Sequence, residues 1–180
     1  MTVVLLAVTS AKAQFELGGV VGGMYGVSAK YWFSENLALQ GDLAVGLTRA
    51  AGAFYYKGEH TPGFDAGMYD FTLNPNVLYH IDLPYDLKFY TGGGMSLGLL
   101  SPLENTASKG IMGKFGLNAV AGLSYNLQQV PLVFAFDFRP GYGLGFQGEE
   151  GATLGMGKGA GAMHFSYFDW KLALAVRYCF

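Results

Sequence analysis

The sequence predicts an all-β protein, an eight-stranded antiparallel up-and-down β-barrel that crosses a membrane. Hydrophobic residues make up 51% of its 180 residues and charged residues only 13%, about half the charged share of an ordinary soluble domain. Apolar residues recur at every second position, and the expected mature chain has no run of about 18 of them, the length that a transmembrane helix needs. Since lipid cannot satisfy an open sheet edge, these observations favour a closed barrel.

Eight segments alternate apolar and polar residues with the period of two that is typical of strands. They cover residues 15–23, 25–33, 37–47, 69–81, 87–99, 115–127, 132–139 and 169–180. Most approach or exceed the roughly 9–11 residues that a tilted strand needs to cross a bilayer. Pro75 falls inside the fourth segment, where the missing N–H predicts a bulge or a break.

Two kinds of connection alternate between these segments. Short, turn-like ones cover residues 34–36, 82–86 and 128–131, and the connection near Gly22 is tight; long polar or glycine-rich ones cover residues 48–68, 100–113 and 140–164. Bacterial barrels have short periplasmic turns, longer extracellular loops and both chain ends in the periplasm. We therefore expect extracellular loops at 48–68 and 140–164. Exposed aromatic residues there are candidate contacts: Tyr55, Tyr56, Phe64 and Phe146.

The polar face of the strands carries charges of both signs. The acids are Glu16, Asp42, Asp70, Asp137 and Asp169, and the bases are Lys30, Lys88, Arg139, Lys171 and Arg177. In a membrane barrel the apolar face meets lipid and the polar face lines the lumen. An eight-stranded barrel is only wide enough for its side chains to fill. Opposed charges there should pair, which predicts a plugged lumen, whereas an ion-selective pore more naturally carries a ring of one sign.

The amino terminus predicts export. Residues 3–8 are apolar, and Ala11-Lys12-Ala13 precedes Gln14, which is the pattern of a secretory signal with its cleavage site. We expect a signal peptide over residues 1–13, whose missing basic start points to an upstream beginning, and a barrel domain over 14–180; the alternative is a short buried first strand. Cys179 is the only cysteine, so an intrachain disulfide is excluded.

Three stretches carry a resemblance to a known family: GVSAKYWFSENLALQGDL, VPLVFAFDFRPGYGLG and LAVRYCF. The mature chain resembles the eight-stranded outer-membrane barrels of the OmpX and OmpA membrane-domain type, and in particular the small porin-like barrels of Bacteroidota. The last stretch resembles the C-terminal signal read by the barrel-assembly machinery, with alternate residues Leu174, Val176, Tyr178 and Phe180. The resemblance implies a location in the bacterial outer membrane, contact with membrane lipid and lipopolysaccharide, and insertion by that machinery.

Other motifs weigh against catalysis and cofactors. His164 and Ser166 form an H-x-S pair on the lipid-facing parity, as in small lipid A deacylases, but the Asn that follows the Ser in that family is missing. Gly143–Gly148 spells G-x-G-x-x-G without the strand-to-helix context of a dinucleotide site. His60, beside Glu59 and Asp65, lacks compact metal-ligand spacing. A net charge of −2 argues against nucleic acid. We expect no cofactor and no metal.

The aromatic and histidine residues of the strands are expected to have structural roles. We expect His80, near the periplasmic end of the fourth segment, to form hydrogen bonds in the lumen. Rings at the two membrane interfaces typically anchor a barrel; the candidates are Tyr31, Phe33, Tyr79, Tyr125, Trp170 and Tyr178.

Four functions stay open from the sequence. The first is a non-enzymatic surface protein that is structural or binds through its loops. The second is a narrow passage for small solutes, which needs a continuous water path through the lumen. The third is a lipid A-modifying hydrolase that depends on His164 and Ser166. The fourth is a soluble lipocalin-like barrel, which would turn its charged face outward and enclose an apolar cavity.

Overall fold

The computed structural model describes residues 15–56, 59–102, 111–127, 129–147 and 163–180. The expected signal peptide over residues 1–13 lies outside this part. The described chain forms eight strands: β1 (Phe15–Gly22), β2 (Met24–Trp32), β3 (Leu37–Tyr56), β4 (Glu59–Asp82), β5 (Leu87–Pro102), β6 (Met112–Asn126), β7 (Leu132–Gln147) and β8 (Met163–Cys179). In this part of the chain, no helix has the length and apolar character needed to cross a membrane.

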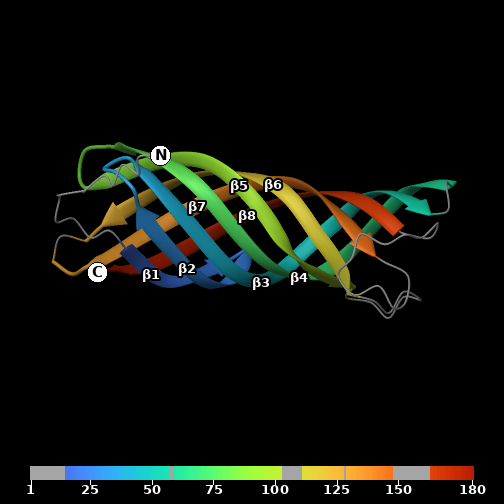
Figure 1. Cartoon of the computed structure of the whole chain (residues 1–180). Coiled ribbons are helices and arrows are strands. Elements are labelled where there is room, and N and C mark those ends of the chain that lie inside the picture. Colours follow the sequence, from blue (N-terminus) through green and yellow to red (C-terminus); the bar gives the residue numbers. More distant parts are fainter. Residues whose placement is uncertain (1–14, 57–58, 103–110, 128, 148–162) are drawn as a thin grey trace, which may run out of the picture.

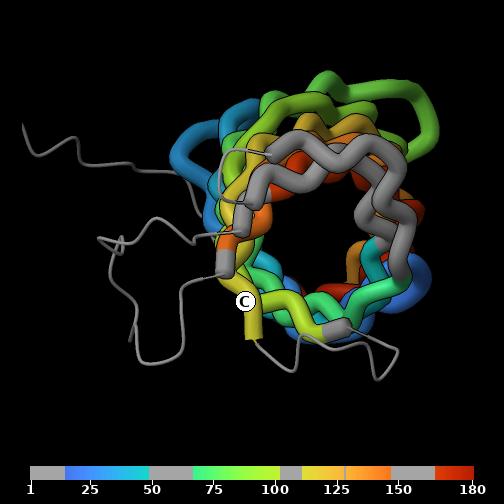
Figure 2. Tube along the Cα trace, turned by 90° about the vertical axis from the view of Figure 1, so that its right-hand side faces the viewer, coloured from blue at the N-terminus to red at the C-terminus, as the bar shows by residue number. Residues whose placement is uncertain are grey.

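The eight strands close into one barrel. Each pairs antiparallel with the next, and β1 pairs with β8 to complete the ring (Figure 2). A row of paired residues that starts at Val20 and passes through every strand reaches Phe165, ten residues before Ala175, the residue that pairs directly with Val20. This stagger tilts the strands against the barrel axis. The prediction of an eight-stranded antiparallel up-and-down barrel is confirmed.

The outer surface of the barrel is apolar along every strand. Leu43, Leu73, Phe136 and Leu174 face outward and are exposed, and none of the outward-facing strand side chains that the structure describes carries a charge. The inner face holds most of the charges instead, together with other polar side chains, small residues and two buried apolar clusters that include Leu78 and Phe165. This distribution is the reverse of that in a soluble barrel, and it excludes the lipocalin-like alternative.

The end that carries β1's start and β8's finish is closed by short turns. Backbone bonds join Phe33 N to Leu37 O (2.9 Å) and Leu83 N to Leu87 O (2.8 Å). Aromatic rings cluster outside this end, where Phe180 lies 5.9 Å from Phe15 and 5.0 Å from Tyr178 between ring centroids. All six expected anchoring rings point outward: Tyr31, Phe33, Tyr79, Tyr125, Trp170 and Tyr178.

The expected loop over residues 48–68 is wrong, because most of it is strand. The β3–β4 ladder continues to Tyr56 and Glu59, well past Met68, where the partner strand β5 ends. Figure 1 shows this β3–β4 ribbon projecting beyond the other strands. The limits of the second loop are also wrong, since residues 140–147 belong to β7 and 163–164 to β8. Beyond the bilayer both faces of a ribbon meet water, so the alternation fades while the ladder persists.

Pro75 neither breaks β4 nor shifts its register. It pairs with Gly41 on β3, and on the other side the β4–β5 ladder lacks pairs only between Leu73 and Asn76, with the register unchanged. The missing N–H therefore costs local ladder bonds rather than the strand. The β3–β4 ladder shifts register elsewhere, between Gly52 and Phe54.

We predict that Gly22→Ala destabilises the barrel. Gly22 has a φ of +117°, and a Cβ there would lie 2.7 Å from the Leu172 carbonyl oxygen. The free energy of unfolding of the barrel should fall by about 1–2 kcal/mol, because an alanine is strained at positive φ. Urea unfolding in lipid vesicles, followed by tryptophan fluorescence, measures the change. Gly41→Ala is the control, since no atom lies within 4 Å of its Cβ position; equal effects would contradict the prediction.

Candidate functional site

The lumen collects the charged residues that the sequence placed on the inner face. Seven of the ten are buried: Glu16, Lys30, Asp42, Asp70, Asp137, Arg139 and Arg177. Lys88, Asp169 and Lys171 are half-buried on the same face. One further cation of the lumen, Lys114, is not predicted from the sequence. The alternation predicts that the sixth strand begins at residue 115, but it begins at Met112. The charges form three groups along the barrel axis, which we call the extracellular, middle and periplasmic groups.

The extracellular group is centred on Asp70. Its Oδ2 accepts hydrogen bonds from Lys114 Nζ and Lys171 Nζ, each at 2.6 Å. Thr48 Oγ1 donates to the same oxygen at 2.7 Å. Asp169 joins the group through Lys171 Nζ at 3.1 Å and Thr48 Oγ1 at 3.2 Å. Two acids and two bases are thus paired, which offsets much of the cost of burying them.

These bonds span a discontinuity in the barrel wall. β1 and β2 are short, and the last bond from their hairpin to β8 joins Gly23 N to Leu172 O at 2.7 Å. Beyond that point β3 and β8 become neighbours, but they pair only at Phe54–Phe165 and Tyr55–His164. We call the stretch between, residues 48–53 of β3 against 166–171 of β8, the notch. The Thr48 hydroxyl, whose one proton is shared between Asp70 and Asp169, links its two edges.

The middle group places one cation between two acids. Arg139 Nη1 lies 2.6 Å from Asp42 Oδ2, and Arg139 also bonds Asp137 through Nε at 3.1 Å and through Nη2. Tyr90 OH donates to Asp137, and Gln40 Nε2 donates to Asp42 Oδ2 at 3.1 Å. All five side chains are buried in the interior of the barrel.

The periplasmic group surrounds Lys30 with aromatic rings. Lys30 Nζ lies 4.7 Å from the Tyr90 ring centroid, 5.6 Å from that of Trp32 and 3.3 Å from His80 Nε2. Trp32 Nε1 donates to Glu16 Oε1 at 2.7 Å. The expected lumen position of His80 agrees with its complete burial. Cation–π contacts of this kind stabilise an ammonium that has left water.

The remaining charges of this end complete the layer. Arg177 Nε donates to Ser28 Oγ at 2.9 Å, and its Nη1 lies 3.9 Å from Glu16 Oε2. Lys88 pairs with Asp82 at 2.8 Å on the rim. Three layers of paired side chains therefore follow one another along the lumen.

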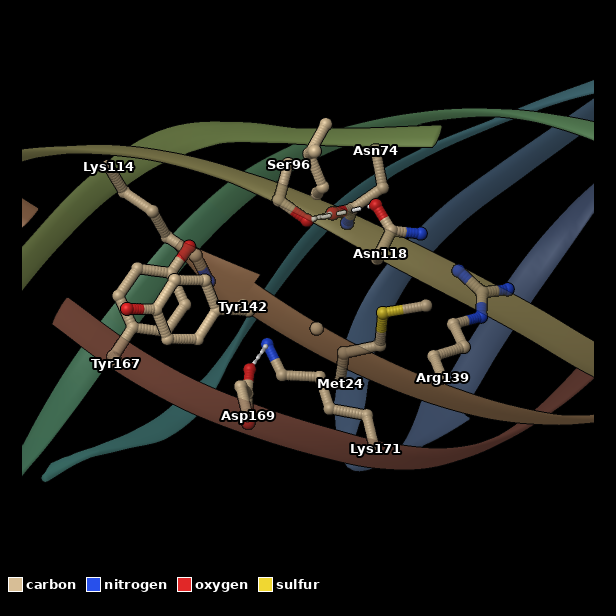
Figure 3. Close-up of a pocket in the computed structure, with 12 residues that line it drawn as sticks. Met24, Asn74, Ser96, Lys114, Asn118, Arg139, Tyr142, Tyr167, Asp169 and Lys171 are labelled. Carbon is tan, nitrogen blue, oxygen red and sulfur yellow. Dashed lines mark hydrogen bonds and ion pairs between the residues drawn. The ribbon is translucent and has the colours of Figure 1, made fainter. Parts of the chain in front are cut away.

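A small cavity lies between the extracellular and middle groups (Figure 3). Its volume is about 30 Å³, enough for ordered water. In Figure 3, Asn74, Ser96 and Asn118 lie along one edge, and Asp169 and Lys171 along the opposite edge. Tyr167 also lines the cavity, and its buried hydroxyl has no hydrogen-bond partner among the described residues.

The residues singled out for other chemistry lie apart from this lumen. Ser166 follows the outward parity of β8, between the buried Phe165 and Tyr167, and the His164 backbone pairs with Phe146; the His164 side chain lies outside the described part. Among the residues described, no group of three or more His, Cys, Asp and Glu side chains could hold a metal ion. Glu59, His60 and Asp65 lie on the β3–β4 ribbon, with side chains outside that part.

The candidate contact and insertion residues lie on strands. Tyr55 and Tyr56 belong to β3 and Phe64 to β4, with side chains outside the described part. Phe146 is on the outer face of β7 instead of on a loop, beside Gly113, where a Cβ would meet its ring. The terminal residues point outward from β8 and the end that follows it: Leu174, Val176, Tyr178 and Phe180.

A closed antiparallel barrel with an even number of strands, an apolar outer surface and a polar lumen is the architecture of bacterial outer-membrane proteins. The protein is an outer-membrane β-barrel. No protein-family model matches the sequence, and no curated protein matches it.

Solved structures that are similar to most of the chain include two bacterial surface proteins. The crystal structure of Neisserial surface protein A (NspA) shares 18% identity, covers 92% of this chain and 93% of that one, and gives a TM-score of 0.43. Ail, the attachment invasion locus protein of Yersinia pestis, in complex with the heparin analogue sucrose octasulfate, shares 14% identity over 91% of this chain and 94% of that one, with a TM-score of 0.39. The assignment of the present chain rests on its own pairing and outer face.

We predict that Arg139→Met strongly destabilises the barrel. The substitution leaves Asp42 and Asp137 buried without their shared cation. The unfolding free energy should fall by about 3–5 kcal/mol, as is typical when one partner of a buried pair is removed. Urea unfolding in lipid vesicles measures it. The triple variant Asp42→Asn/Arg139→Met/Asp137→Asn should recover part of the loss, because no charge is then left alone.

Lys88→Met is the matched control for this prediction. Its partner Asp82 has a side chain that is 70% exposed, and exposed pairs contribute about 1 kcal/mol or less. A loss in Lys88→Met as large as that in Arg139→Met would show that the buried network adds nothing beyond a surface pair.

Proposed function

We propose that this barrel is a non-enzymatic surface protein with a blocked lumen, which serves a structural or binding role through its projecting β3–β4 ribbon. The observation that carries the proposal is the continuous series of paired, buried side chains along the lumen. The ribbon is the feature most suited to contact outside the membrane. The proposal includes export by the signal peptide at residues 1–13 and insertion by the barrel-assembly machinery through Leu174, Val176, Tyr178 and Phe180.

The middle group supports a blocked lumen. Arg139, Asp42 and Asp137 cross the interior from β7 to β3, and Tyr90 adds a fully buried ring from β5. A solute would have to displace this layer and leave charges unpaired in a narrow space, which is costly. The cavity above the layer, at about 30 Å³, has room for no more than a water-sized group.

The length of the β3–β4 ribbon supports a surface role. β3 and β4, with 20 and 24 residues, exceed every other strand described. Beyond Met68 their ladder continues without β5, and β3 pairs with β8 only at Phe54–Phe165 and Tyr55–His164. This part of the ribbon carries Tyr55, Tyr56 and Phe64, aromatic residues of the kind that anchor interfaces. The apolar outer face meets membrane lipid, and the ribbon emerges at the level where lipopolysaccharide is the neighbour.

The hydrolase alternative receives little support from the geometry. Ser166 faces outward on β8, and a serine nucleophile needs an adjacent base that a third group orients. The described residues near it are Phe165, Tyr167 and, across the ladder, Leu144. Phe165 and Leu144 have no hydrogen-bonding side chain, and Tyr167 is buried in the interior, so none of the three supplies that third group at the outer face.

We predict that the barrel forms no open channel in planar bilayers. Conductance steps should be absent for the native protein in concentrated KCl. They should appear in Tyr90→Ala/Arg139→Ala, which removes two large side chains from the middle of the lumen. Lys88→Ala at the rim is the control and should stay silent. Steady conductance by the native protein would overturn the blocked lumen and support a narrow passage.

We predict that the ribbon is accessible from outside the cell. In a Cys179→Ser background, Tyr56→Cys at the ribbon tip should react with a membrane-impermeant maleimide on intact cells. Glu35→Cys, in the short turn between β2 and β3, is the control and should react only after the outer membrane is permeabilised. The opposite pattern would invert the barrel and end the proposed surface role.

A further inference from the structure

The notch between β3 and β8 changes the construction of the barrel wall. Below it the wall contains all eight strands, because β1 and β2 separate β8 from β3. Above it β3 pairs with β8 directly, so the wall there contains six strands. Along the notch, the facing backbone groups of β3 and β8 pair neither with the β1–β2 hairpin nor with each other. Within a bilayer such groups need water or a ligand as partners.

The notch lies at the level where the membrane meets water on the extracellular side. It begins at Leu172, the last residue of β8 bonded to the β1–β2 turn. Trp170 and Phe168 follow on β8 and are both 60% exposed on the outer face. Tyr142 stands beside them on β7, opposite Phe168. A girdle of aromatic residues marks the interfacial level of a barrel.

The cavity shown in Figure 3 lies directly behind the notch. Four of its lining residues also frame the notch: Met24 at the top of the β1–β2 hairpin, and Tyr167, Asp169 and Lys171 on β8. Met24 is buried against the interior. The cavity and the notch thus form one feature, with a polar interior on one side of the wall and lipid on the other.

The residues that line the cavity indicate which chemical group could bind there. Both of its lysines, Lys114 and Lys171, are already bonded to Asp70. One polar atom of the lining is buried without a hydrogen-bond partner among the described residues, the Tyr167 hydroxyl. It lies against Gly116 and Gly143, where a Cβ would come within 2.6 Å and 2.4 Å of it respectively. An uncharged hydrogen-bonding group fits this site better than an anion.

We propose that the notch is a lateral entrance from the outer leaflet, through which the cavity takes the small uncharged head of a single-chain amphiphile. The head bonds the Tyr167 hydroxyl, and the chain leaves through the notch past Trp170 into lipid. The Thr48–Asp169 bond spans the entrance and holds it narrow. The middle group below the cavity keeps the path closed toward the periplasm, so this site is compatible with a blocked lumen.

The test uses dodecanol with a photoreactive diazirine at carbon 2, added to the native barrel in phospholipid vesicles. Mass spectrometry then locates the label. We expect label on Met24 and Tyr167, which face the interior, as well as on outward residues such as Trp170. Label confined to outward residues would overturn the proposal.

Two glycine substitutions make the test specific. Gly141 lines the cavity and has ordinary contact distances, 3.4 Å or more, around its Cβ position. Gly141→Val fills the cavity and should reduce interior labelling by about tenfold, since the cavity holds little more than water. Gly41→Val is the matched control in open space and should label as the native protein does. Interior labelling that survives Gly141→Val would also overturn the proposal.

A third variant addresses the entrance itself. Asp169→Ala removes the bond to Thr48 but leaves Lys171 on Asp70, so the barrel retains its central pair. Interior labelling should rise several-fold. An unchanged or lower value, with the heat-dependent gel shift of a folded barrel preserved, would show that the notch does not control access.

Discussion

The structure depends on one constraint: within lipid, every backbone N–H and C=O must find its partner inside the sheet. Closure of β1 on β8 meets this constraint in the eight-stranded part of the wall, below the notch. Closure in turn fixes the direction of every side chain. Apolar side chains then face lipid and polar side chains face the narrow interior. There each buried charge needs a partner of opposite sign. The salt-bridged lumen is thus a consequence of closing the wall.

The three charged groups divide this interior differently. The extracellular group is centred on one acid, Asp70, that serves two lysines, whereas the middle group is centred on one base, Arg139, that serves two acids. The periplasmic group relies on aromatic rings around Lys30 as much as on Glu16. Each group thus compensates its buried charges in a different way. The extracellular group joins β4 to β6 and β8, and the middle group joins β3 to β7.

Sequence alternation foretold the strands, their inward and outward faces and the lumen position of ten charges, because the bilayer imposes two contrasting environments along every strand. It failed where that contrast ends. Residues 48–56 and 59–68 continue as strand in water, and Lys114 stands in a strand start that looked like loop. The pairing of Lys114 with Asp70, or the notch above the short β1–β2 hairpin, depends on the stagger between strands. Periodicity within one segment carries no information about that stagger.

The ring is closed by the two ends of the described chain: Phe180 N bonds Phe15 O at 2.9 Å. No local hairpin can substitute for the β1–β8 ladder, whose partners are separated by nearly the whole chain. Such a topology slows folding, because the entropy cost of closing so large a loop comes before the contacts that the closure allows. Until this ladder forms, β1 and β8 each present an unpaired edge, and unpaired strand edges are sites of aggregation.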